Sequence, residues 1–137
     1  MNRISRILIC LTIICAAAVQ AQLTVVLSPV QIGGQKAIVS LAMTNNLADS
    51  VESARAVCFL LDEQGKMAGQ STKWVIGGTK DRPALQPKSG TTFNFVITSP
   101  QPFITTNLTA QVSFSRLVLE GEKLANPKTD VQIQNCK

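Results

Sequence analysis

The sequence predicts an all-β protein that folds as an antiparallel, two-sheet sandwich of seven or eight strands. Short segments in which apolar and polar residues alternate recur between residues 23 and 134. Gly, Pro, Asn and Asp separate these segments at short spacing, which is typical of turns between strands. The apolar spacing of an amphipathic helix is almost absent after residue 22. Alternation with a period of two gives each strand one buried and one wet face, so two sheets stacked on one core are expected, with a barrel as the alternative.

The first two strands are expected at Leu23–Val30 and Lys36–Thr44. Pro29 has no N–H to donate to a ladder, so the first strand is predicted to be an edge strand that breaks there. Alternation in the second strand predicts an inward face formed by Val39, Leu41 and Met43.

The next two strands are expected to form a hairpin around the turn Asp62–Lys66, where Gly65 is free to take a positive φ. The segment "SARAVCFLLD" carries its large apolar residues at every second position. It predicts an inward face formed by Val57, Phe59 and Leu61. Cys58 is then expected on the opposite face. The segment "MAGQSTKWVIGG" predicts the returning strand, which ends at a pair of glycines.

Three more strands are predicted in the second half of the chain, from the segments "TTFNFVIT", "LTAQVSFSRLVLE" and "TDVQIQ". A long loop with two prolines, "TKDRPALQPKS", precedes the first of them. The residues expected to face inward are Phe93, Phe95, Ile97, Ala110, Val112, Phe114, Val131 and Ile133.

The order of these strands, the chain length and the lack of helix signals favour an immunoglobulin-like (fibronectin III-like) sandwich. The segment Ile38–Ile97 also resembles the FxLYD-type exported bacterial domains. The shared features are a "TNN" turn, then "VCFLLDEQGKM", then "LQPKSGTTFNFVI" with Leu85, Pro87 and Phe93 in an L-x-P-x-x-x-x-x-F pattern. Cys58 and Leu61 stand where the namesake motif has Phe and Tyr. The resemblance implies an exported immunoglobulin-like domain and supplies no catalytic residue.

The first 21 residues have the layout of a secretory signal peptide. Arg3 and Arg6 form a basic start, an apolar run follows to Val19, and small residues precede a cleavage site after Ala21. The apolar run is shorter than the ~20 residues that a membrane-spanning helix needs. We therefore expect a single domain over residues 22–137, exported to the periplasm or the cell exterior, with no membrane insertion after cleavage. A retained anchor and a lipidated Cys15 are the alternatives.

The cysteine count predicts one disulfide. Of the four cysteines, Cys10 and Cys15 leave with the signal peptide, and Cys58 and Cys136 remain. An even pair in an exported chain normally bonds in the oxidising compartment that it reaches. A bond between Cys58 and Cys136 would close a loop over most of the domain. The loop-entropy model gives a stabilisation of about 4 kcal/mol for such a loop.

The composition argues against an enzyme, a cofactor and a metal centre. The chain has no histidine and no tyrosine, so a catalytic cysteine or serine lacks its usual base. A Ser71–Lys73 pair is the remaining route to a hydrolase. Two cysteines without histidine do not make a zinc site. The formal net charge of +5 falls to +3 without Arg3 and Arg6, and the remaining basic residues are scattered, so no nucleic-acid binding is expected.

With catalysis and nucleic-acid binding disfavoured, the sequence is compatible with two binding functions. The first is a non-catalytic, exported β-sandwich that contacts another envelope or extracellular protein. The second is a carbohydrate-binding module that uses Trp74 and the loop 77–90. Long loops on rigid sandwiches often carry binding residues. The candidate surface therefore consists of Trp74, Lys80, Arg82 and Lys88, although a tryptophan that plugs the core is the other interpretation of Trp74.

The mature chain is predicted to begin at Gln22 and to carry no free thiol. Intact-mass spectrometry of the protein from its exporting cell tests both points. Reduction should add the mass of two hydrogens. A free thiol before reduction, or a lipid on Cys15, would contradict the prediction.

Overall fold

The structure is a computed structural model that describes residues 21–105 and 107–135, and it is built from β-strands in these parts of the chain. Residues 1–20 of the predicted signal peptide (residues 1–21) and Cys136 lie outside the described residues. The described strands are β1 (Leu23–Leu27), β2 (Gln31–Gly33), β3 (Lys36–Asn45), β4 (Val51–Leu61), β5 (Met67–Ile76), β6 (Gly90–Thr98), β7 (Thr109–Leu119), β8 (Lys123–Leu124) and β9 (Val131–Asn135). The all-β prediction is confirmed, and β2 and β8 are short strands that the sequence did not indicate.

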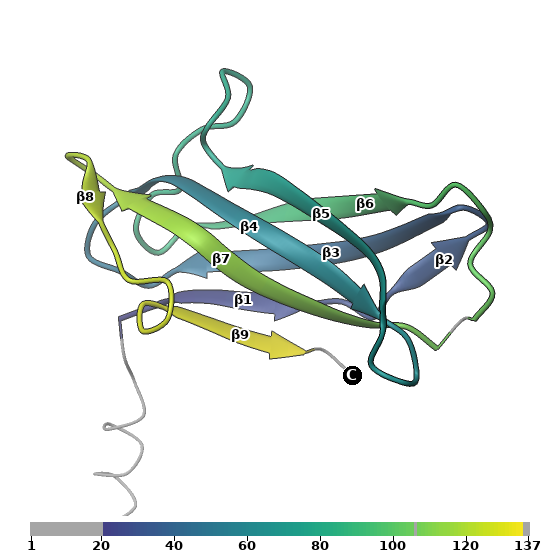
Figure 1. Ribbon diagram of the computed structural model, residues 1–137. Coiled ribbons are helices and arrows are strands. Elements are labelled where there is room, and N and C mark those ends of the chain that lie inside the picture. The colour runs from purple at the N-terminus through teal and green to yellow at the C-terminus, as the bar shows by residue number, and fades with distance from the viewer. Residues whose placement is uncertain (1–20, 106, 136–137) are drawn as a thin grey trace, which may run out of the picture.

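The strands form two sheets that lie face to face (Figure 1). In the five-stranded sheet, β6 pairs with one edge of β3, while β1 and β2 follow each other along the opposite edge. The four-stranded sheet has the order β5-β4-β7-β8. Its central pair, β4 and β7, runs antiparallel from Val51 opposite Leu119 to Leu61 opposite Thr109. The chain thus builds a two-layer sandwich, as predicted.

The position of β1 differs from the prediction of an edge strand. On one side β1 pairs with β3, and on the other it pairs in parallel with β9, where Leu23 lies opposite Val131 and Leu27 opposite Asn135. Two parallel strands cannot be joined by a tight turn, so a long stretch of chain must separate them in sequence. Seven strands lie between β1 and β9 in this chain. The sandwich is therefore not wholly antiparallel, and the break at Pro29 divides β1 from β2 instead of ending a sheet edge.

The core lies between the two sheets, and most of the predicted inward faces are confirmed. Val39, Leu41 and Met43 on β3 are buried, as are Phe95 and Ile97 on β6 and the three predicted residues of β7. Phe93 is half-buried at the margin of this cluster. Ile133 on β9 is the exception, because 37% of its surface is exposed at the outer strand of its sheet.

The predicted face of β4 is wrong. The residues that face the core are Ala54, Ala56, Cys58 and Leu60. Val57, Phe59 and Leu61 lie on the outer face of the sheet, where they are half-buried. Both faces of this central strand are apolar, so alternation alone could not decide between them. The small alanines on the inner face leave space in the same core for bulky residues of the other sheet such as Phe95.

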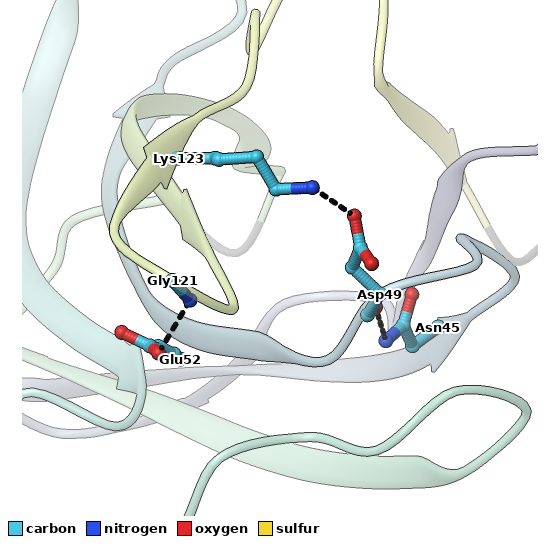
Figure 2. A network of polar contacts seen from close by, with 5 residues as sticks. All are labelled: Asn45, Asp49, Glu52, Gly121 and Lys123. Atoms are coloured by element: carbon cyan, nitrogen blue, oxygen red, sulfur yellow. Dashed lines mark hydrogen bonds and ion pairs between the residues drawn. The ribbon is translucent and has the colours of Figure 1, made fainter.

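Asn45, at the end of β3, is a fully buried polar residue that connects three segments of the chain. Figure 2 shows its contact with Asp49. Its side-chain Nδ2 donates to the carbonyls of Asp49 and Leu85 at 2.9 and 3.0 Å, and its Oδ1 accepts from the Leu47 amide at 2.9 Å. The loop held in this way carries the chain from one sheet to the other. Beside it, Asp49 pairs with Lys123 of β8 at 2.9 Å. The hydrogen bonds of Asn45 therefore set the crossover between the sheets.

We predict that Asn45→Ala lowers the free energy of unfolding by about 2–4 kcal/mol. The substitution leaves the Asp49 carbonyl and the Leu47 amide without their partner, and the Leu85 carbonyl keeps only its bond from the Val51 amide. Urea denaturation measures the change. Asn46→Ala is the matched control, since that exposed side chain makes one hydrogen bond to Thr24. It should change stability by less than about 0.5 kcal/mol. Equal effects of the two substitutions would contradict the role given to Asn45.

Candidate functional site

Cys58 is a core residue and not a surface thiol. Its side chain is fully buried on the inner face of β4, which is the face opposite to the one predicted. Desolvation by this burial raises the pKa of the Cys58 thiol to about 11. Because the thiolate is the reactive form, the folded chain keeps Cys58 unreactive at neutral pH. Its predicted disulfide partner, Cys136, lies outside the described residues, so the disulfide stays a prediction.

Trp74 lies half-buried on the outer face of the four-stranded sheet, so it is neither a core plug nor fully exposed. It stands opposite Arg55 of β4, whose guanidinium carbon is 5.9 Å from the centre of the indole ring. Gly78 packs against another part of the same ring. A Cβ on Gly78 would come within 2.5 Å of the indole, and this glycine has a φ of +78°. These neighbours fix the indole in one position on the sheet.

The other three residues of the predicted surface, Lys80, Arg82 and Lys88, lie in different surroundings. Arg82 donates to the main-chain carbonyl of Trp74, and its guanidinium carbon lies 4.7 Å from the centre of the Phe93 ring on β6. It therefore anchors the loop after β5 to both sheets. Lys80 is exposed on that loop. The amide of Lys88 donates to the carbonyl of Asn45, which places this residue at the end of β3. Trp74 and Arg82 are thus brought together, and no hydrogen bond or cation–π contact joins Lys80 or Lys88 to them among the described residues.

Two arginines that the sequence analysis missed lie beside Trp74. Arg55 on β4 is directly opposite Arg116 on β7, and both side chains are exposed. The register is irregular on both sides of Arg55, because Val75 of β5 and Ser115 of β7 are extra residues at this point. In the sequence alone, each arginine is one polar residue on its own strand, and nothing there indicates that the two lie side by side. Their pairing depends on the register and the bulges, which the sequence pattern does not reveal.

The edge of β7 is open along most of its length. β8 pairs with Val118 and Leu119, and the amide of Ala125 donates to the carbonyl of Leu117. The stretch Thr109–Arg116 pairs with β4 on one side and has no partner strand on the other within the described part of the chain. An unpaired edge of this kind offers main-chain donors and acceptors to another strand.

A groove runs beside this edge, between β7 and the strands β1 and β9. It consists of two adjoining hollows of about 300 and 310 Å³, which share Leu27, Ala110 and Asn135 in their walls. Val112 and Ile133 supply further apolar surface to the first hollow, and Gln111 and Ser113 line it from the outer face. The partial exposure of Ile133 is explained by this position. The groove can receive apolar side chains of a segment that lies along β7.

The described residues show no constellation for metal or nucleophilic chemistry. They contain no group of three His, Cys, Asp or Glu residues close enough to hold a metal ion. Ser71 and Lys73 both lie on β5, opposite Cys58 and Ala56 of β4, and no hydrogen bond joins them in the described part of the chain. No helix in this part of the chain is long and apolar enough to cross a bilayer.

Comparison with known proteins gives one distant structural likeness. The chain is similar to the crystal structure of a Bordetella pertussis protein assigned as ApaA, with 12% sequence identity, a TM-score of 0.49, and coverage of 70% of this chain and 82% of that one. This likeness is too distant to assign a family or an activity. No protein-family model and no curated protein matches the chain.

The burial of Cys58 predicts a specific alkaline destabilisation of the reduced protein. The unfolded thiol has a pKa near 9.0 and the folded thiol one of about 11. Between these pH values the unfolded state binds fewer protons, so the free energy of unfolding falls as pH rises, by up to ~2–3 kcal/mol. Urea denaturation of the reduced protein from pH 8 to pH 11 measures the slope. Cys58→Ala should remove this component. Parallel curves for the two proteins would show that burial does not perturb the thiol.

Proposed function

We propose that this chain is a non-catalytic, exported protein-binding module that contacts a partner through the open edge of β7. The proposal follows from the unpaired stretch Thr109–Arg116 and the groove beside it. The exported setting is supported by the signal-peptide pattern of residues 1–21. The partner is another protein of the envelope or the cell exterior.

The sequence of the open edge supports a binding role. Protein edges are usually protected by proline, lysine, a bulge or a short length. Residues 109–114 read "TAQVSF" and contain no proline and no charge, and the bulge on this strand comes only at Ser115. An extended segment that pairs with β7 would form main-chain hydrogen bonds and place alternate side chains in the groove. Strand addition of this type is a common mode of peptide recognition.

A protein partner explains these features better than a sugar does. The unpaired groups along β7 are main-chain amides and carbonyls at the repeat of a polypeptide strand. The carbohydrate-binding alternative depends on Trp74, which lies half-buried on the outer face of the sheet, where a sugar ring could stack. Arg55 and Gly78 already contact parts of that ring. Carbohydrate binding is therefore the second candidate.

At the level of the fold we propose an immunoglobulin-like, fibronectin III-like sandwich. The strands β1, β3 and β6 take the places of A, B and E, and β5, β4, β7 and β8 those of C′, C, F and G. The last strand then divides, because β8 stays beside β7 while β9 crosses to pair with β1. A relation to the FxLYD-type domains is part of this proposal and is supported by the turn and strand segments that the two share.

A photo-crosslinking amino acid at position 111 tests the proposed function. Gln111 is exposed on β7 and lines the groove, so we expect ultraviolet light to join the exported protein to a protein partner there. Thr92, exposed on β6 of the other sheet, is the matched control position. Hydrogen exchange of the purified complex should then show slower exchange of the amides in Thr109–Arg116.

Two results would contradict the proposal. The first is the absence of adducts at position 111, or equal adducts at positions 111 and 92. The second is a complex whose slowed amides lie away from β7. Binding of glycans with a change in Trp74 fluorescence, and without adducts at position 111, would favour the carbohydrate-binding module.

A further inference from the structure

We propose that Trp74, Arg55 and Arg116 form a carboxylate-binding row for an acidic partner. Arg116 binds an Asp or Glu of the partner segment that pairs with β7, and Arg55, beside Trp74, binds a further acidic residue of that partner over the outer face of β4. The row crosses three adjacent strands, β5, β4 and β7, on the outer face of the four-stranded sheet. Its end at Arg116 coincides with the end of the open edge. The inference rests on the proposed function, since it names the chemistry of the segment that occupies that edge.

The two arginines form an uncompensated pair of charges. Residues directly opposite each other in an antiparallel pair have Cβ atoms roughly 5 Å apart, and like charges there destabilise the sheet. Within residues 21–105 and 107–135, the single ion pair joins Lys123 to Asp49, and no carboxylate lies within ion-pair distance of Arg55 or Arg116. The acidic residue nearest along β4, Glu52, accepts a hydrogen bond from the Gly121 amide at 3.1 Å (Figure 2). The row therefore has positive charge to offer an external anion.

Two irregularities of the backbone lie beside Arg55 and affect where the side chains of the row point. The extra residues Val75 and Ser115 stand on either side of Arg55, and β-bulges redirect the side chains around them. The Ser115 hydroxyl donates to the Arg55 carbonyl at 3.4 Å. Trp74 holds Arg55 at a distance of 5.9 Å from the ring centre, which restricts the long arginine side chain. A guanidinium held in this way loses less freedom when it forms a two-pronged contact with a carboxylate.

The open edge of β7 beside Arg116 favours an anion that belongs to a polypeptide. A ligand that reaches Arg116 from the free side of β7 lies where a strand would pair with Thr109–Arg116. A polypeptide satisfies that edge, and its acidic groups are the carboxylates of Asp and Glu. The apolar groove lies toward the other end of the same stretch, around Ala110 and Val112. The partner segment is therefore expected to have apolar residues at one end and an acidic residue at the other.

Trp74 provides a direct readout, because it is the only tryptophan in the chain. We expect poly-L-glutamate to change the Trp74 emission of the exported protein in a saturable manner, and poly-L-lysine to leave it unchanged. A second readout is the fluorescence anisotropy of a fluorescein-labelled oligoglutamate peptide, which does not depend on the environment of the indole. Inorganic phosphate and a sulfated polysaccharide, heparin, are the comparison anions.

Charge-matched variants separate this site from general attraction to a basic protein. Arg55→Gln and Arg116→Gln should each weaken oligoglutamate binding by at least ~10-fold. Lys66→Gln removes the same charge at the turn of the β4–β5 hairpin, at the far end of the sheet from Trp74, and should leave binding unchanged. Arg116→Lys keeps the charge but loses the planar fork, and should weaken binding several-fold. Circular dichroism verifies that each variant is folded.

Equal losses with Arg116→Gln and Lys66→Gln would overturn the inference, as would unchanged binding with Arg116→Lys. Tighter binding of heparin than of oligoglutamate, lost with Arg55→Gln, would also overturn it and would assign the row to a sulfated sugar. The two proposals fail in different ways. Adducts at position 111 without oligoglutamate binding would retain the edge contact and reject the acidic segment. Oligoglutamate binding without adducts would reject the edge contact, and with it the proposed function.

Discussion

The crossover between the two sheets depends on the buried carboxamide of Asn45. Its side chain satisfies main-chain groups of Leu47, Asp49 and Leu85, and it does so with no exposure to water. Its own amide and carbonyl bond to Ser89 and Lys88. One residue thus fixes the loop that leads into β4 and the loop that leads into β6. Because β4 is the second strand of its sheet, a shift of this crossover would move every strand that pairs with it. The satisfied hydrogen bonds define one position of the two layers, whereas apolar contacts alone tolerate sliding.

The two faces of β4 have different roles in the proposed binding module. Its inner face, from Ala54 to Leu60, belongs to the core, and its outer face carries Arg55, Val57 and Phe59. Arg55, the central residue of the row, is therefore attached to a strand that is paired on both sides along most of its length, and Trp74 and Arg116 lie on the two strands that pair with it. Residues on such a strand are held more firmly than residues on a loop, which suits a site that must present two guanidinium groups in a defined arrangement.

The sequence predicted the architecture better than the surface. Alternation identified the long strands and the inner faces of β3, β6 and β7, because those strands have polar residues on one face and apolar residues on the other. It failed at β4, where both faces are apolar, and at β1, whose partner β9 is distant in sequence. The length and the basic residues of the loop 77–90 predicted a binding surface there. Its Arg82 instead packs on Phe93 and bonds to the Trp74 carbonyl. The row of Trp74, Arg55 and Arg116 arises from register and two bulges, and neither is visible in a pattern of single strands.

The positive charge at the open edge also disfavours a second copy of this chain as its partner. A second copy of this chain is a possible occupant of any unpaired strand, since an edge pairs readily with itself. The open stretch "TAQVSFSR" contains an arginine and no acidic residue. Pairing β7 with β7 of another copy would bring more arginines to the outer face and supply no carboxylate to Arg55 and Arg116. It would also bring together two chains of like net charge. An acidic partner strand satisfies the main-chain edge and Arg116, and a further carboxylate of the same partner can pair with Arg55. The same two arginines that attract such a strand therefore act against self-association, which a chain with an open strand edge must avoid.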